Sequence, residues 1–238
     1  MKKYLSLLLT GLLFFCTGCA SSPNVASIED APEPTDYTVA ADTFDPSQYQ
    51  QIGSFSSIID LESLLPTLEE LAEQSDNIVY GRVLSTQNYD QSGRGQTLYT
   101  FEIQRSYRGN LLPGDTISVV ADGGYVRLSR YIAVNGSGHF EDMTQQEIDA
   151  SMIYSAPAMG APLPEEGDIY LLFLDQPLAG EEYEPKGAYS EHLFSSRFIC
   201  GEDGTLSRYV PEENYYGEGE RSYTLEEMER HLSQLLAE

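Results

Sequence analysis

The run IYLLFL, residues Ile169–Leu174, is the feature that most constrains the fold of this chain. No polar side chain interrupts it; Gly167 and Asp168 precede it, and Asp175 follows it. A strand with one exposed face alternates apolar and polar residues, whereas a strand that is buried on both faces is apolar throughout. The run therefore predicts the central strand of a sheet with both faces covered.

Three segments before this run have the properties of antiparallel strands. In QTLYTFEIQRSYR, polar residues alternate with a buried side that is predicted to consist of Tyr99, Phe101, Ile103 and Tyr107. Strands are also predicted over 77–85 and 116–121, and turns rich in glycine connect the three segments. Together they predict a three-stranded meander.

Further strands are predicted over 125–134, 189–200 and 205–210. The sequence GEDG between the last two indicates a tight hairpin. Residues 135–167 lose this periodicity, apart from a short helix that the capping box of Thr144 and Glu147 opens. We interpret 135–167 as an insertion in the sheet.

Two segments have the apolar spacing of amphipathic helices. Between Ile58 and Ala72 the apolar residues recur at steps of three and four, and Pro66 predicts either a kink or two short helices, the second ending near Gln74. Near the C-terminus, a capping box opens a second helix with one apolar stripe, formed by Leu225, Met228, Leu232, Leu235 and Leu236. Both helices are predicted to pack on the sheet.

The pattern as a whole predicts a mainly β fold. About seven short strands are joined by turns, a helix stands at each end, and no βαβ alternation is present. These features favour a small antiparallel barrel or curled sheet with an N-terminal and a C-terminal packing helix, and an open sandwich is the alternative.

The first residues have the layout of a secretory signal peptide. Lys2 and Lys3 precede an apolar run, Leu5–Phe15, which is shorter than the roughly 20 residues that a membrane-spanning helix needs. The following CTGC resembles the lipobox of bacterial lipoproteins, with Cys16 where that family usually has leucine. The resemblance implies removal of residues 1–18 and acylation of Cys19, for example with palmitate. An ordinary signal peptide that is cut elsewhere is the alternative.

The segment 19–56 is predicted to be a disordered acidic tether, because it contains four prolines and scattered acids without an apolar period. The folded domain is then predicted to span 57–238. After processing, the chain would retain Cys19 and Cys200, so an acylated Cys19 excludes an intramolecular disulfide. We interpret Cys200 as a buried structural thiol.

The order of segments between residues 68 and 206 resembles an OB-like, netrin-type barrel. The resemblance is carried by LAEQSDNIVYGRV, TLYTFEIQRSYRG, PGDTISV, GDIYLLFL and a late DG hairpin. Such barrels are present in uncharacterised surface lipoproteins of Gram-positive bacteria, which implies a lipid-anchored protein outside the cell membrane. Netrin-type protease inhibitors depend on an N-terminal cysteine wedge that this chain lacks, so inhibition of metalloproteases is not implied.

The formal net charge of −25 argues against nucleic acid and anionic membrane surfaces as partners, because both would repel the chain. Attachment to the membrane is therefore predicted to depend on the lipid. The expected location is extracytoplasmic, anchored to the cell membrane.

No catalytic, metal-binding or cofactor-binding motif is present. The three histidines, His139, His192 and His231, are not spaced for a catalytic triad, and the acidic loops lack the EF-hand pattern, although a weak calcium site stays open. We therefore predict no catalytic residue, no metal and no cofactor. Whether the protein is an enzyme is left open, with a binding role favoured.

Tyrosine is unusually common, with seventeen in the chain and no tryptophan. Tyr215, Tyr216 and Tyr223 surround a glycine-rich loop and could offer aromatic faces to a sugar or peptide, or could instead pin the loop to the fold. The favoured function is a non-enzymatic binding module for a protein or glycan at the cell envelope. The alternative is an envelope hydrolase with paired carboxylates, which a deep carboxylate-lined pocket would favour.

Overall fold

The computed structural model describes residues 32–56, 65–157, 160–180, 184–191, 196–210 and 219–237. From Glu33 onward, these residues belong to one compact unit. The predicted signal peptide and Cys19 lie outside the described residues. Within the described ranges, no helix is both long enough and apolar enough to cross a membrane.

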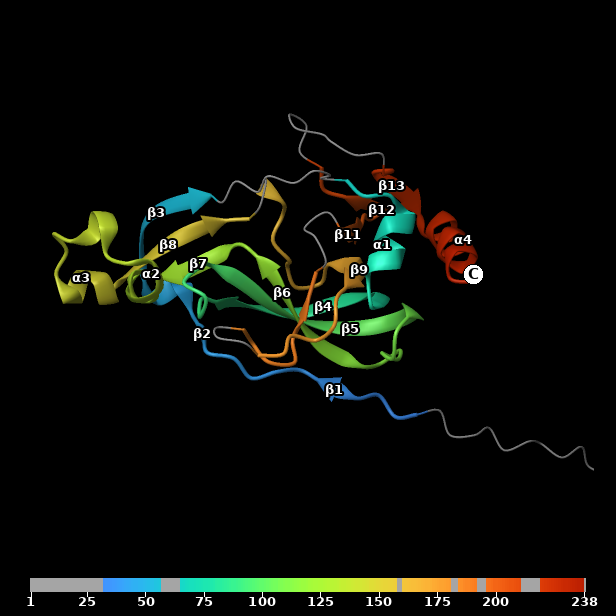
Figure 1. Cartoon of the computed structure of the whole chain (residues 1–238), viewed down its shortest axis with the longest axis horizontal. Coiled ribbons are helices and arrows are strands. Elements are labelled where there is room, and N and C mark those ends of the chain that lie inside the picture. Colours follow the sequence, from blue (N-terminus) through green and yellow to red (C-terminus); the bar gives the residue numbers. More distant parts are fainter. Residues whose placement is uncertain are drawn as a thin grey trace, which may run out of the picture. The chain divides into compact units, whose positions relative to one another are not determined.

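The described part of the chain is mainly β, as predicted, with helices between strands and after the last strand (Figure 1). The strands are β1 (Asp36–Tyr37), β2 (Thr43–Phe44), β3 (Gln50–Ser56), β4 (Asn77–Tyr89), β5 (Gln96–Arg108), β6 (Thr116–Asp122), β7 (Gly124–Arg127), β8 (Ser151–Ala156), β9 (Ile169–Leu174), β10 (Tyr189–Ser190), β11 (Arg197–Cys200), β12 (Thr205–Arg208) and β13 (Ser222–Thr224). The α-helices are α1 (Leu68–Gln74), α2 (Leu128–Asn135), α3 (Gln145–Asp149) and α4 (Leu225–Leu235), and the 3₁₀ helices are η1 (Pro46–Gln48) and η2 (Gly138–Phe140).

Ten of the described strands form one mixed sheet, whose main path is β1-β6-β5-β4-β9-β11-β12-β13. The ladders from β6 to β13 are antiparallel, while β1 and β10 both pair with β6 in parallel. The predicted meander and the hairpin between β11 and β12 are therefore confirmed. A wholly antiparallel sheet is not, because two short parallel strands pair with β6.

The large sheet curls without closing into a barrel. β10 pairs with β6, and the next residue, Glu191, forms an isolated antiparallel bridge with Leu174 at the end of β9. In the sheet order, β5 and β4 separate β6 from β9. The segment 189–191 thus pairs with both β6 and β9, which are not neighbours in the sheet. Glu191 lies where the curl brings these two strands close to the same segment.

Strand β9 is the central, doubly buried strand that its apolar run predicts. It pairs with β4 on one side and β11 on the other. Tyr170, Leu172 and Leu174 belong to an inner core, which lies in the space that the curl encloses. The inner core consists of Val79, Val83, Tyr99, Phe101, Ile103, Leu111, Ile117, Val119, Ala121, Tyr170, Leu172, Leu174 and Tyr189.

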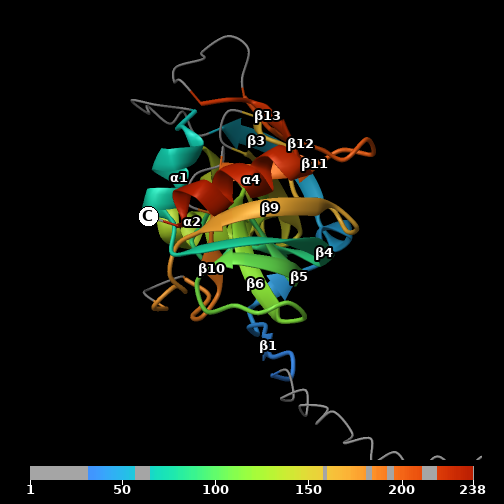
Figure 2. The same cartoon turned by 90° about the vertical axis from the view of Figure 1, so that its right-hand side faces the viewer.

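The opposite face of β9 contributes Leu171 and Phe173 to a helix-covered core. This core consists of Leu68, Leu71, Ala72, Ile78, Tyr80, Leu171, Phe173, Phe198, Leu206, Tyr223, Met228 and Leu232. Figure 2 shows α1 and α4 lying over this face of the sheet. The packing of the C-terminal helix on the sheet is confirmed.

Both covering helices begin at complete capping boxes. Thr67 and Glu70 open α1, and Thr224 and Glu227 open α4, so each box satisfies backbone N–H groups that a helix start leaves unpaired. Helix α1 ends at Gln74, as the sequence predicts. The predicted N-terminal part of that helical segment, 57–64, lies outside the described residues.

Two predictions about the strands are wrong, one for the orientation of Tyr107 and one for the strand over 125–134. Tyr107, expected beside Tyr99 in the inner core, packs against the helix-covered core, because register shifts in the β4–β5 pair displace the alternation of side chains. The strand expected over 125–134 ends at Arg127 and continues as α2, where Leu128, Tyr131 and Ile132 share one apolar cluster at helical spacing.

The segment 135–167, predicted to be an insertion, contains the expected capped helix α3 and also β8, which the sequence did not indicate. Strand β8 pairs with β7 and with β3, and the three form a second sheet. Figure 1 shows this small sheet beside α2 and α3.

The prediction of a disordered tether is wrong for residues 36–56, which contain three strands. β1 pairs with β6, β2 with β4, and β3 with β8. The prolines of this segment are compatible with pairing, because Pro34 precedes β1 and Pro46 begins η1. The folded domain consequently starts near Glu33 and not at residue 57.

Candidate functional site

A buried ion pair between Glu191 and Arg197 lies beside the inner core, where it contacts Tyr99 and Tyr170. Nη1 of Arg197 donates to Oε1 of Glu191 at 3.0 Å, and the two side chains are only 5% and 7% exposed for Arg197 and Glu191 respectively. Because isolated charges in a protein interior are costly, a pair this deep must be satisfied by neighbouring groups.

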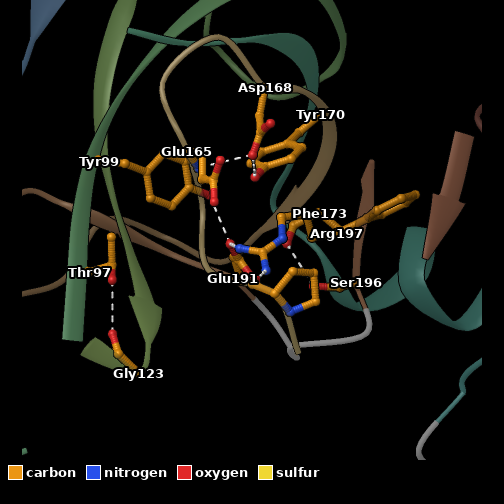
Figure 3. A network of polar contacts seen from close by, with 11 residues as sticks. Thr97, Tyr99, Gly123, Glu165, Asp168, Tyr170, Phe173, Glu191, Ser196 and Arg197 are labelled. Atoms are coloured by element: carbon orange, nitrogen blue, oxygen red, sulfur yellow. Dashed lines mark hydrogen bonds and ion pairs between the residues drawn. The ribbon is translucent and has the colours of Figure 1, made fainter. Parts of the chain in front are cut away.

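Two tyrosines from the sheet supply those neighbouring groups. The hydroxyl of Tyr99, on β5, donates to the same Oε1 of Glu191 at 2.8 Å. The ring of Tyr170, on β9, lies under the Arg197 guanidinium, with 5.1 Å between its centroid and Cζ. Figure 3 shows Tyr99, Glu191 and Arg197 pointing toward one another. Strands that are distant in the sequence therefore converge on one charge pair.

The guanidinium of Arg197 also bonds to the loop before β9. Besides its bond to Glu191 and its position over Tyr170, Nη2 donates to the backbone carbonyl of Pro162. The Tyr170 hydroxyl donates in turn to Asp168, whose Oδ2 also accepts the backbone N–H of Glu165 at 2.9 Å. This chain of contacts ties the loop before β9 to the ion pair, so the position of Arg197 is fixed.

Burial changes the pKa values of Glu191 and Tyr99. Loss of water raises the pKa of the Glu191 carboxyl, while the positive charge of Arg197 and the hydroxyl of Tyr99 oppose that rise. Burial also raises the pKa of Tyr99 well above its ordinary value, and the negative charge of Glu191 adds to this effect. Tyr99 therefore remains a proton donor to the carboxylate at neutral pH.

A cavity of about 440 Å³ adjoins the ion pair, and Glu191 and Arg197 form part of its wall. This volume lies within the range of roughly 300–1,000 Å³ that is typical of small-molecule sites. The remaining lining residues are Ser92, Gln96, Val120, Ala121, Asp122, Pro157, Ala161, Leu178, Glu184, Pro185 and Ser190. They come from the end of β6, the turn between β4 and β5, the start of β5, the segment between β8 and β9, the segment between β9 and β10, and β10 itself.

The turn after β6 places Asp122 at this cavity. Thr97 donates its hydroxyl to the carbonyl of Gly123 at 2.9 Å, and the N–H of Gly123 donates to Gly95. Gly123 has φ of +101°, a conformation that other residues rarely adopt, and an added Cβ would contact Pro157. The exposed carboxylate of Asp122 is thus held at the cavity by a fixed backbone.

One oxygen of Glu191 is left for a further partner. Both hydrogen bonds to this carboxylate use Oε1. Within the described ranges, no group donates a hydrogen bond to Oε2, although an ionised carboxylate can accept several. The cavity therefore presents a deeply placed, oriented acceptor.

The predicted site residues lie elsewhere or outside the described residues. Tyr215 and Tyr216 belong to the undescribed segment 211–218, as His192 belongs to 192–195. Tyr223 is 6% exposed and packs between Phe198 and His231 in the helix-covered core. This placement fits the structural alternative for Tyr223, since a buried ring offers no face to a ligand.

Cys200 is half-buried and lies near the hydroxyl of Tyr80, with 4.0 Å between the sulfur and oxygen atoms. It is not among the described residues that line the cavity. In the part of the chain that the structure describes, no cluster of three or more histidine, cysteine or acidic residues is arranged to hold a metal ion.

Sequence reasoning missed Glu191 and Arg197 as site residues. The only available signal was weak: Arg197 directly precedes the apolar residues Phe198 and Ile199 in a predicted strand, and a charge that is buried beside them requires a buried partner. The identity of that partner depends on the curl of the sheet, which brings Glu191 and Tyr99 together across 92 positions of sequence.

Comparison with known proteins gives no family assignment, since no family model matches the sequence and no curated protein resembles it significantly.

Proposed function

We propose that the protein is a lipid-anchored, extracytoplasmic binding protein, non-enzymatic, whose partner is a protein or glycan at the cell envelope. The observation that carries this proposal is the preformed cavity, with a charge pair that is already oriented in its wall. Binding sites gain affinity when their polar groups are fixed before the ligand arrives.

The anchoring part of the proposal rests on the leader and the CTGC sequence. A strongly acidic chain has no electrostatic attraction to an anionic membrane, so a lipid on Cys19 would supply the attachment. The curl of β6, β5, β4 and β9 supports a relationship to the OB-like, netrin-type barrels of surface lipoproteins, although this sheet does not close.

Photocrosslinking in intact cells tests the binding function. A photoreactive phenylalanine derivative replaces Leu178, which lines the cavity, and a matched control replaces Val134, an exposed residue of α2 outside the lining. We expect one discrete adduct from position 178 and none from position 134. Equal adducts at the two positions, or none at 178, would contradict the proposal.

Metabolic labelling tests the anchor separately. An alkyne analogue of palmitate is expected to label the wild-type protein and to leave the Cys19→Ser variant unlabelled. Labelling that persists in the variant would mean that another residue carries the lipid. A lack of label in the wild type would contradict the proposed lipid anchor.

The hydrolase alternative also has an observation in its favour. Asp122 and Glu191 both line the cavity, and the negative charge of Asp122 contributes to the raised pKa of Glu191, after the larger effect of burial. However, Arg197 and Tyr99 engage Oε1 and favour the charged carboxylate, whereas a general acid must carry a proton. Release of reducing ends from envelope polysaccharides by the wild type, and its loss in Glu191→Gln, would favour catalysis.

A further inference from the structure

The charges around the cavity decide which ligands it accepts. Three acidic residues, Asp122, Glu184 and Glu191, face one basic residue, Arg197, among the described lining residues. Arg197 is already bonded to Glu191 and to the carbonyl of Pro162. An anionic ligand would therefore meet uncompensated negative charge, without a free cation to bind it.

The nonpolar part of the lining is aliphatic. Val120, Ala121 and Leu178 line the cavity together with prolines, and no aromatic ring is present among the described lining residues. A sugar ring usually packs on an aromatic face, so this wall suits an alkyl chain better than a saccharide. A ligand with a short aliphatic stem and a cationic head matches both halves of the cavity.

The unused oxygen of Glu191 is an independent indication of where the head would lie. The Glu191 side chain is more than nine-tenths buried, yet its Oε2 accepts no hydrogen bond from the described residues. Oε2 is not one of the fully buried polar atoms that lack a partner among the described residues, so it is accessible from the cavity. An ammonium group provides three donors in a compact charge for such an acceptor.

We propose that the cavity binds an alkylammonium group, either the side chain of a lysine on a partner protein or a free amine, with the ammonium between Glu191 Oε2 and Asp122. The stem of the group packs against Val120, Ala121 and Leu178. This inference rests on the proposed binding function and specifies the chemistry of its ligand.

Isothermal titration calorimetry of the purified full chain tests this inference with defined probes. Nα-acetyl-lysine amide represents a lysine of a protein, and 1,5-diaminopentane represents a free amine. Acetyl-norleucine amide and 1,5-pentanediol have matching stems without the charge, and glutarate reverses the charge. We expect both amines to bind and the three controls to give no heat of binding. Binding of Nα-acetyl-lysine amide, whose single charge and peptide amides represent a protein side chain, supports a lysine as the source, and binding of 1,5-diaminopentane alone supports a free amine.

Variants locate the binding. Asp122 is exposed, so Asp122→Asn should fold normally and weaken amine binding about three- to tenfold, while Glu191→Gln should weaken it at least about tenfold. Glu226→Gln removes the same charge from the exposed side of α4 and should change affinity less than about twofold. Circular dichroism establishes that each variant is folded, and Asp122→Asn decides the test if Glu191→Gln is not.

Three results would overturn the inference: no binding of either amine to the wild type, equal binding of the uncharged controls, or equal weakening by Glu226→Gln and Asp122→Asn. The proposed binding function would survive these results if the crosslink at position 178 persisted. Absence of that crosslink would instead contradict the proposed binding function.

Discussion

The two faces of β9 are both buried, but they are built from different chemistry. Leu171 and Phe173 face a core that α1 and α4 cover with apolar side chains. Tyr170 and Leu172, one residue away in each case, face the inner core, which ends at the Glu191–Arg197 pair and a cavity. Helices cover one face, whereas the core on the other face borders the ion pair and the cavity.

The two faces therefore differ in what they contribute to protein stability and to ligand recognition. Burial of apolar surface stabilises a fold without directional requirements. A buried ion pair stabilises little overall, because desolvation offsets the attraction between its charges, but it fixes the position of polar groups. We therefore attribute the stability of the unit mainly to both apolar cores and its specificity to the polar end of the inner core.

The largest expected effect comes from breaking the ion pair. Arg197→Gln leaves Glu191 buried without its cation and should lower the free energy of unfolding by about 3–5 kcal/mol at pH 8. Urea denaturation measures this loss. A double variant, Glu191→Leu with Arg197→Met, removes both charges and should recover most of it. A single variant as stable as the wild type would mean that the pair is not buried in solution.

The stability of Arg197→Gln relative to the wild type is expected to depend on pH. Burial raises the pKa of Glu191 above the ordinary 4.5, and loss of the opposing charge of Arg197 raises it further. The folded state of Arg197→Gln then favours the protonated acid, so the contribution of Glu191 to stability is fully present below pH 4.5 and is lost as pH rises through the raised pKa. Relative to the wild type, the destabilisation should grow from pH 5 to pH 8. A constant difference would contradict this explanation.

Truncation of neighbouring leucines on β9 compares the two faces directly. Leu171→Ala and Leu172→Ala each remove a fully buried side chain, one from each core, and each should cost about 2–5 kcal/mol. Chemical denaturation of the two variants tests this. A loss below about 1 kcal/mol in either variant would show that its face is not a packed core.

A smaller effect is expected when the hydrogen bond from Tyr99 is removed. Tyr99→Phe retains the ring in the inner core and should destabilise the protein by about 1–3 kcal/mol, because the bond is to a charged group. Tyr37→Phe is the control, since Tyr37 is 42% exposed and loss of its hydroxyl should change stability little. The absorbance of ionised tyrosine should show one fewer group that resists titration in the Tyr99 variant. An unchanged titration would place the Tyr99 hydroxyl in solvent.

The smallest expected effect comes from the cap of the covering helix. Thr224→Ala removes the hydroxyl that accepts the N–H of Glu227 and should cost about 0.5–2 kcal/mol in thermal or chemical unfolding. Thr144→Ala removes the same cap from α3, which has no buried residue, and should cost less. A larger loss from Thr144→Ala would indicate that α3, and not α4, is the more important helix for stability.

The sequence predicts those parts of the fold that local pattern determines. The apolar run of β9, the alternation at Tyr99 and Phe101, and the capping boxes at Thr144 and Thr224 each give the correct element. In each case, neighbours in the sequence decide the structure, through side-chain period or through a hydrogen bond across three residues.

Elements that depend on distant pairing are predicted poorly. β1 and β3 are short, polar strands that form because β6 and β8 offer them backbone partners. The parallel pairing of β10 with β6 and the bridge at Glu191 also depend on the curl of the sheet. The candidate site could not be predicted for the same reason, since Tyr99, Glu191 and Arg197 meet only after that curl has formed.

The most direct test of the central claim is a crystal structure of the full chain with saturating 1,5-diaminopentane. The account predicts an ammonium group in the cavity, about 2.7–3.2 Å from a carboxylate oxygen of Glu191 or Asp122. An amine bound elsewhere, or a cavity that remains without the amine at saturation, would contradict it.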